Sequence, residues 1–167
     1  MNVHEVFERL QEKFGNEGVS LAAPAVGDAA VVVAPGRLLE VCRFLKSAPG
    51  LEFDYLRCVS GVDLKDRMES VYHLHSISAG HGLVLKVVLD RADPQVDSVE
   101  PVWKSANWFE RESFDLLGIR YLGHPNLERI MMPRDWVGHP LRKDYVEQES
   151  YHGIPTSRPD PVGGKDA

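Results

Sequence analysis

The sequence predicts a two-layer α+β fold, with helices packed on a mixed β-sheet and a long extended arm at the C-terminal end. Segments with apolar residues at helical spacing alternate with short strand-like runs in the order α-β-β-α-β-β-β-α. The 167 residues are 43% hydrophobic and 26% charged, which is typical of one globular domain. From residue 118 onward, six glycines and six prolines fall within 50 residues, too many for regular structure. We therefore expect a folded body over residues 1–118 and an arm over residues 119–167.

The N-terminal part of the chain predicts a helix followed by a hairpin. Apolar residues recur there at helical spacing, namely Val3, Phe7, Leu10 and Phe14. Asn2 and Glu5 form the pattern of a capping box, and Gly15 is a typical helix stop. Two short strand-like runs follow at residues 19–23 and 29–34, and we expect them to pair as a β-hairpin.

The middle of the chain predicts a second helix and three strands. The hairpin turn covers residues 24–28, and Pro35 stands where a helix can begin. One apolar stripe then runs through Leu38, Leu39, Cys42 and Leu45. Pro49-Gly50 ends this helix. The three strands are expected at residues 53–62, 70–78 and 83–90, with a turn between the last two at residues 79–82.

A last helix is expected over residues 108–117, with Asn107 as N-cap and Gly118 as the left-handed residue at its end. Glu110 lies three residues after Asn107 and can close a capping box with it. Glu112 falls in the apolar stripe of this helix, so we expect it to be partly buried beside a basic partner.

The same helix carries a candidate ion pair, because Arg111 and Asp115 are four residues apart. Paired carboxylates can perform acid–base chemistry, but ionised groups in an apolar stripe usually have a structural or interface role. Three histidines could together bind zinc, since His73 and His75 share a strand face and His81 follows in the turn. Strand histidines are more often structural, so we expect no metal site.

Composition disfavours several classes of function. Lys and Arg total 19 against 25 Asp and Glu, and a net charge of −6 disfavours nucleic-acid binding. The two cysteines, Cys42 and Cys58, cannot ligate an iron–sulfur cluster alone. No apolar run approaches the roughly 20 residues of a membrane span, and no secretory signal is visible. These observations predict a soluble, cytoplasmic chain without a redox cofactor of its own.

The arm carries apolar anchors that it cannot bury in itself. They are Tyr121, Leu127, Ile130, Met131, Met132, Trp136, Leu141 and Tyr145. Arginines and carboxylates between them can pair across an interface, so the pattern favours a subunit that wraps a partner. Such an arm is expected to be mobile in the free chain and ordered in the complex. The alternative is a free-standing soluble enzyme that gathers Glu112, His124 and His139 in one pocket.

An ordered series of motifs spans the last helix and the arm. It consists of Glu110, Arg111, Glu112, Phe114, Asp115, Gly118 and Ile119, then Gly123, His124, Pro125, Leu127, Arg129 and Ile130, then Asp135, Trp136, Gly138, His139, Pro140, Leu141, Arg142, Lys143, Asp144 and Tyr145. The series resembles the C subunit of NADH-quinone oxidoreductase, the 30 kDa subunit family of respiratory complex I. An equivalent subunit of a membrane-bound hydrogenase, or of a ferredoxin- or F420-linked complex, is the alternative within this resemblance.

The resemblance implies a structural role in a large assembly. That complex passes electrons from NADH through FMN and iron–sulfur clusters to quinone and couples this to ion translocation. The family member carries none of these cofactors, so the motif residues are expected to be packing and interface residues rather than catalytic or metal-binding ones. The expected partners are the D subunit at the quinone site and the cluster-bearing B and I subunits. The expected location is the cytoplasmic side of the cell membrane, with membrane contact only through the complex.

Overall fold

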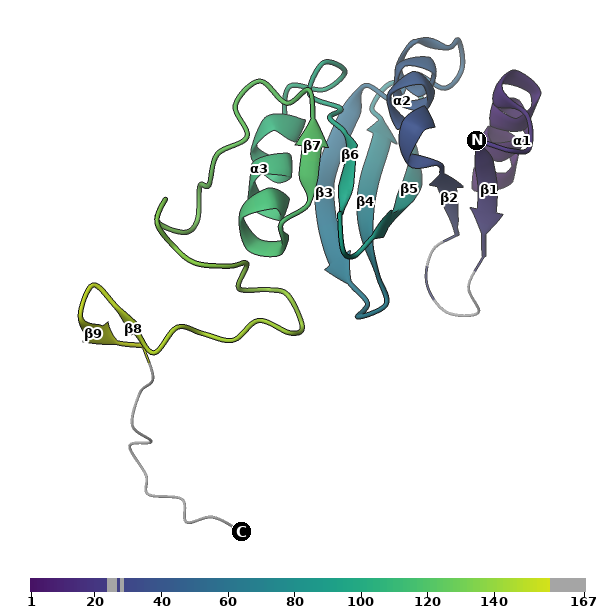
Figure 1. The fold of residues 1–167 in the computed structure, drawn as a ribbon. Helices are drawn as coiled ribbons and strands as arrows, with labels where there is room; N and C mark the ends of the chain where they lie inside the picture. The colour runs from purple at the N-terminus through teal and green to yellow at the C-terminus, as the bar shows by residue number, and fades with distance from the viewer. Residues whose placement is uncertain (24–26, 28, 157–167) are drawn as a thin grey trace.

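The computed structural model describes residues 1–23, 27 and 29–156, which form the α+β architecture expected from the sequence (Figure 1). The first elements are α1 (Val3–Phe14), β1 (Val19–Ala22), β2 (Ala30–Val33), the 3₁₀ turn η1 (Pro35–Arg37) and α2 (Leu38–Ser47). Three long strands follow, β3 (Tyr55–Asp63), β4 (Arg67–Ser76) and β5 (His81–Asp90). The chain then forms β6 (Gln95–Asp97), α3 (Ala106–Leu117), β7 (Arg120–Leu122), β8 (Ser150–Tyr151) and β9 (Ile154–Pro155).

Five strands form one sheet in the order β1-β2-β5-β4-β3. Strands β2 and β5 run parallel while the other neighbours run antiparallel, which confirms the expected mixed sheet. The expected hairpin is the antiparallel β1–β2 pair, whereas its turn at residues 24–28 lies outside the described residues except for Gly27. Two smaller sheets, β6–β7 and β8–β9, escaped prediction because strands of two or three residues are too short to show an alternation of apolar and polar positions.

The first helix begins as the sequence predicts. The Asn2 side chain accepts a hydrogen bond from the Glu5 amide at 3.0 Å, and the Glu5 carboxylate accepts one from the Asn2 amide at 3.0 Å. These reciprocal bonds form a capping box that satisfies amides at the helix start. At the other end, the Phe14 ring meets Phe44 of α2 edge to face, with ring centroids 5.7 Å apart. Helices α1 and α2 are therefore linked to each other as well as to the sheet.

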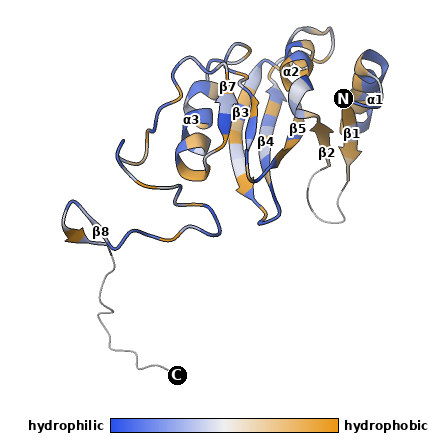
Figure 2. Ribbon diagram, in the orientation of Figure 1, coloured by the Kyte–Doolittle hydropathy of each residue, from blue (hydrophilic) through white to orange (hydrophobic). Residues whose placement is uncertain are grey.

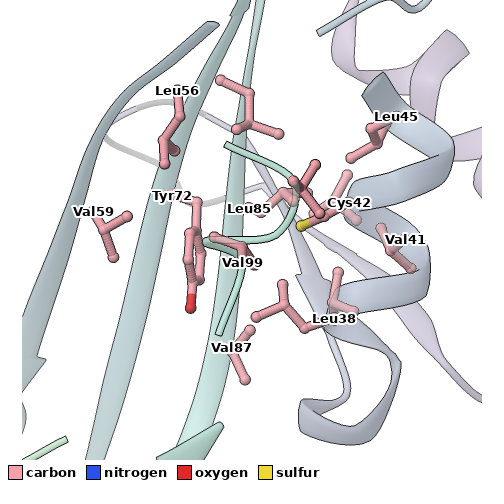
Figure 3. Close-up of a cluster of buried hydrophobic side chains, with 14 of the residues drawn as sticks. Leu38, Val41, Cys42, Leu45, Leu56, Val59, Tyr72, Leu85, Val87 and Val99 are labelled. Carbon is pink, nitrogen blue, oxygen red and sulfur yellow. The ribbon is translucent and has the colours of Figure 1, made fainter. Parts of the chain in front are cut away.

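The core lies between these helices and one face of the sheet. Figure 3 shows apolar side chains of α2, including Val41 and Cys42, directed at side chains of the sheet such as Tyr72 and Leu85. Along β5 the buried residues alternate with more exposed ones, so every second side chain belongs to this core. This alternation leaves the opposite face of the sheet without a share in the core.

Helix α3 begins earlier than expected and without the expected cap. Its N-cap is Ser105, which makes no side-chain capping bond, and Asn107 lies inside the helix. The preceding turn is fixed by the Trp103 indole, which donates to the Phe53 carbonyl at 3.0 Å, while the Ala106 amide donates to the Trp103 carbonyl at 3.0 Å. The chain is therefore already turning at Trp103, before it reaches Asn107.

The chain beyond α3 first adds a short strand to the body and only then continues as the extended arm. Residues 119–122, which the sequence analysis assigns to the arm, include buried Ile119 and Tyr121 and form β7 beside β6. The Tyr121 hydroxyl lies 3.1 Å from the Ser70 hydroxyl inside the core. Figure 2 shows that β1 and β2 are hydrophobic, whereas the later part of the chain is mostly hydrophilic with separate hydrophobic segments. Only from residue 123 does the described chain run without long secondary structure.

Candidate protein-docking surface

The extended segment closes the C-terminal end of α3. The last carbonyl groups of a helix have no partner inside it. Three arm residues bond to three of them: His139 Nδ1 donates to Asp115 O (2.9 Å), the Leu141 amide to Leu116 O (2.9 Å), and Arg142 Nε to Leu117 O (2.7 Å). Burial lowers the pKa of His139, which favours the neutral ring that makes this bond. These arm residues therefore act together as a cap for one helix.

Asp115 fixes the start of the arm on α3. Its buried carboxylate receives a hydrogen bond from Arg129 at 2.7 Å. The same group accepts three successive backbone amides, those of Ile130 (2.9 Å), Met131 (2.7 Å) and Met132 (2.9 Å). Burial opposes ionisation of this carboxyl, but the amides and the guanidinium outweigh it and hold the pKa below its usual value. The arm is thus bound to the body at residues 129–132.

The expected ion pair between Arg111 and Asp115 is wrong, because Asp115 faces the arm. Arg111 instead lies over the Trp108 ring, 5.1 Å from its centroid, and donates to the Glu128 carbonyl at 3.1 Å. Trp108 is 64% exposed and was not among the predicted residues. Its position three residues before an arginine on a helix was the signal that could have identified a cation–π pair.

A second attachment joins the arm to the strand ends. Arg91 bonds buried Asp63 through two nitrogens (2.8 and 2.9 Å) and also bonds Asp144 of the arm at 2.6 Å. The Lys143 amide donates to Asp63 at 2.9 Å. The hydrogen bonds from Arg91 keep the pKa of Asp63 well below its usual range. Asp63 and Arg91 were also missed, since neither stands in the motif series and only the fold brings them to Asp144.

Gly118 is required at the junction for two reasons. Its φ of +76° lies in the left-handed region, as expected for the end of a helix. In addition, a Cβ at this position would stand 2.6 Å from the His139 ring and 2.8 Å from the Arg142 guanidinium. The close approach of these two side chains therefore depends on a residue without a side chain.

Large apolar side chains of the arm remain exposed even though its backbone is bound. Met131 is 63% exposed, Val137 68% and Leu141 58%. Trp136 and Tyr145 are half-buried against each other, and the Trp136 indole donates to the Tyr145 hydroxyl at 3.0 Å. A segment that fixes its backbone and still exposes such side chains offers a preformed apolar surface.

The two glutamates of α3 occupy the reverse of their expected environments. Glu112, expected to be partly buried, is exposed, while Glu110, expected to cap the helix, is fully buried. Glu110 accepts hydrogen bonds from the Ser98 hydroxyl (2.6 Å) and the Val99 amide (2.8 Å). Burial raises the pKa of Glu110 to about 7, although both hydrogen bonds oppose the shift. The buried face of α3 runs through Ala106, Glu110, Ser113 and Leu117 at helical spacing, so position 110, and not position 112, faces the core.

The residues of the enzyme alternative do not converge. His124 Nε2 donates to the Asn107 carbonyl at the start of α3, whereas His139 binds Asp115 near its end. Eight residues of helix separate these carbonyls, about 12 Å along the axis. Glu112 lines a separate cavity of about 260 Å³ between α3 and β3, which neither histidine lines. His124 and His139, each followed by a proline (Pro125 and Pro140), thus hold loop segments on a helix.

The histidines of the sheet make no metal site in the structure. His81 opens β5, rather than lying in a turn as expected, and its Nε2 donates to the Leu51 carbonyl at 2.9 Å. Its ring also packs edge to face on Phe53. Within residues 1–23, 27 and 29–156, no group of three His, Cys, Asp or Glu side chains could hold a metal ion.

This chain is similar to known proteins over most of its length. A family model described as the 30 kDa subunit of respiratory-chain NADH dehydrogenase matches residues 31–151. The C subunit of NADH-quinone oxidoreductase from Roseiflexus sp. (strain RS-1) is 45% identical over 142 residues, which cover 83% of this chain and 81% of the relative. The C subunit from Geobacter sulfurreducens is 43% identical over 153 residues, covering 87% of this chain and 93% of the relative.

Two solved structures share the fold. A structure titled "Nqo5 of the trypsin-resistant fragment (1-134)" is 30% identical, with a TM-score of 0.62 over 73% of this chain and 99% of that chain. A chain from a membrane-bound sulfane sulfur reductase, an archaeal respiratory membrane complex, has a TM-score of 0.63 over 86% of this chain and 85% of that chain. At 19% identity, this second likeness shows the fold alone.

Together, fold and site define a two-layer α+β protein whose extended C-terminal segment is fixed across the end of its last helix. None of the described helices is long and apolar enough to cross a membrane. With residues 31–151 matched, the chain belongs to the 30 kDa subunit family of respiratory-chain NADH dehydrogenase, complex I. Its relatives are subunits of an oxidoreductase complex of respiratory electron transport.

Proposed function

We propose that this chain is a structural subunit of a proton-translocating NADH:quinone oxidoreductase, in the hydrophilic part of that complex outside the membrane. In this role it binds no cofactor and has no catalytic residue. It supports electron transfer from NADH, through FMN and iron–sulfur clusters held by its partners, to quinone. Its partners are other subunits of the complex, with the D subunit at the quinone site and the cluster-bearing B and I subunits as the specific candidates. Its place is peripheral, on the cytoplasmic side of the cell membrane.

The apolar surface of the arm is the observation that carries this proposal. Met131, Val137 and Leu141 stay exposed, although the bonds of Asp115 and of the α3 carbonyls fix the backbone around them. Exposure of such side chains is unfavourable in water, but the backbone that carries them is already fixed, which lowers the entropy lost when a partner buries them. The names of the relatives, all subunits of one complex, support a neighbouring subunit as that partner.

The test replaces the exposed anchors without touching the bonds that fix the arm. A full-length tagged chain carrying Met131→Asp and Val137→Asp should capture at least tenfold less of its partner subunits from detergent-solubilised membranes. The reason is that a carboxylate in the centre of an apolar interface must be desolvated without a counter-charge. Flavin and iron in the captured material, together with NADH:quinone reductase activity, measure the complex.

Ile77→Asp serves as the matched control. Ile77 is 68% exposed, like Val137, but lies in the turn between β4 and β5. This variant should capture the complex as the unaltered chain does. Equal capture by the arm variant and the control would remove the arm from the docking surface, and capture of no flavin-containing complex by any chain would reject the proposed function.

A further inference from the structure

The second face of the five-stranded sheet carries an unusual arrangement of side chains. Lys86 lies near its centre, on β5. The register places Val71 of β4 and Val32 of β2 beside it, and Val84 and Val88 flank it along its own strand. A lysine on this face thus has valine as its neighbour in all four directions. Val88 is 40% exposed, and Val32, Val84 and Lys86 are half-buried, so these four side chains are open to a partner, whereas Val71, the remaining residue of this valine–lysine patch, is buried beneath them.

None of the helices packed into the core contributes to this patch. The core takes the alternate residues of the same strands, such as Tyr72 of β4 and Leu85 of β5 (Figure 3). Among the described residues, no carboxylate lies within ion-pair distance of the Lys86 ammonium. Sheets with one face in water usually alternate apolar residues inward with polar residues outward. The valines depart from that pattern, and the unpaired lysine at their centre needs a counter-charge once water is removed.

The shape and charge of this face favour an acidic partner. A hollow of about 520 Å³ is lined by Val62, Leu64, Arg67, Glu69, Val71, His73, Val84 and Lys86. A second hollow, of about 350 Å³, shares His73 and Val84 with it and adds Arg57, and it reaches the sheet edge at Val3 of α1. Three cationic side chains and one carboxylate line the two, and Arg67 is already paired with Asp66 and Glu69, which leaves Arg57 and Lys86 without a carboxylate partner among the described residues, on a chain whose net charge is −6. The local excess is opposite in sign to the charge of the whole molecule.

We propose that this valine–lysine patch is a second docking surface, which binds an acidic amphipathic helix of another subunit. Apolar residues of that helix cover the valines, and a carboxylate at its centre pairs with Lys86. A helix about 10 Å wide spans two strands spaced about 4.8 Å apart, which matches the width of β4 and β5. A second copy of this chain fits poorly, because a two-fold contact of the patch with itself would bring like charges together. The inference rests on the proposed function, since it needs an assembly, but it concerns a surface separate from the arm.

Photo-crosslinking in the intact complex tests which surface meets a partner. A photoreactive residue replaces Val88 in one full-length chain, Met131 in a second and exposed Lys13 of α1 in a third. The Val88 probe should attach to a segment of another subunit that carries carboxylates and apolar residues at helical spacing, and the Lys13 probe should attach to no subunit. A crosslink from Met131 without one from Val88 overturns the patch and leaves the proposed function intact. If neither the Val88 probe nor the Met131 probe crosslinks to another subunit, both the patch and the proposed function are overturned. A crosslink from Val88 to a second copy of this chain overturns the patch.

Charge reversal tests the pairing with Lys86. Lys86→Glu should reduce retention of the chain in the purified complex at least tenfold, whereas Lys86→Arg, which keeps the charge, should stay within twofold of the unaltered chain. Lys13→Glu controls for the change in net charge. Thermal unfolding of each free variant shows that the chain still folds. Equal retention of Lys86→Glu and Lys86→Arg overturns the pairing.

Discussion

At the scale of single residues, the feature with the largest consequence is a carboxyl group inside the core. Glu110 accepts hydrogen bonds from the Ser98 hydroxyl and the Val99 amide, and its charge helps to raise the pKa of buried Cys42, Tyr72 and Tyr121. Because burial raises its pKa from 4.5 to about 7, the folded chain holds a proton that the unfolded chain releases at neutral pH. Folding is therefore favoured by this group at acid pH and disfavoured at neutral pH.

Glu110→Gln should remove this pH dependence. Between about pH 4.5 and pH 7 the folded state binds more protons than the unfolded state, so the stability contributed by Glu110 falls as pH rises. The gain in unfolding free energy of the variant over the unaltered chain should grow across that window to about 3 kcal/mol. Urea titrations at several pH values measure it, and exposed Glu112→Gln is the control. A constant difference between the two variants across the window would contradict the assignment.

At the scale of elements, sequence patterns located the long helices and strands, the start of α1 and the end of α3, but neither the start of α3 nor the short strands. The capping box of α1 was predictable because both partners lie within four residues of each other. The start of α3 was not, because the Trp103 indole fixes it through Phe53, fifty residues away. Contacts between residues far apart in the sequence also define the candidate site. The motif series marked Asp115, Arg129 and Arg142, but spacing along the chain could not show that Arg129 binds Asp115 or that Arg142 binds the end of α3.

The attachment of the arm predicts a pattern of amide exchange different from that expected from composition. Composition suggests an arm that is mobile when free, whereas the amides of residues 130–132 are bonded to Asp115. Asp115→Ala leaves Arg129 without its carboxylate partner and should lower the free energy of the opening that exposes these amides by about 3 kcal/mol or more. This loss corresponds to roughly hundredfold faster exchange of these amides. Hydrogen exchange on the free full-length chain measures it. Asp135→Ala, which removes an exposed partner of His152, should leave these amides protected, and equal exchange in both variants would exclude Asp115 as the anchor.

At the scale of the whole molecule, the body and the arm do not separate at Gly118. Truncation after Gly118 removes buried Ile119 and Tyr121, whose loss from a core typically costs about 2–5 kcal/mol each. The shortened chain should lose its cooperative thermal transition, measured by circular dichroism, whereas truncation after Tyr145 should keep it. A transition of the 1–118 chain at the same temperature as the full chain would show that β7 is dispensable.

The cap on α3 also has a consequence for the order of events during synthesis. The carbonyls of Asp115, Leu116 and Leu117 find their partners at His139, Leu141 and Arg142, which the ribosome adds about two dozen residues later. The last turn of α3 is therefore finished only after residue 142 has been made. A nascent chain that ends before residue 139 presents an unfinished helix end, and with it an arm that has nothing to hold it on the body at that point.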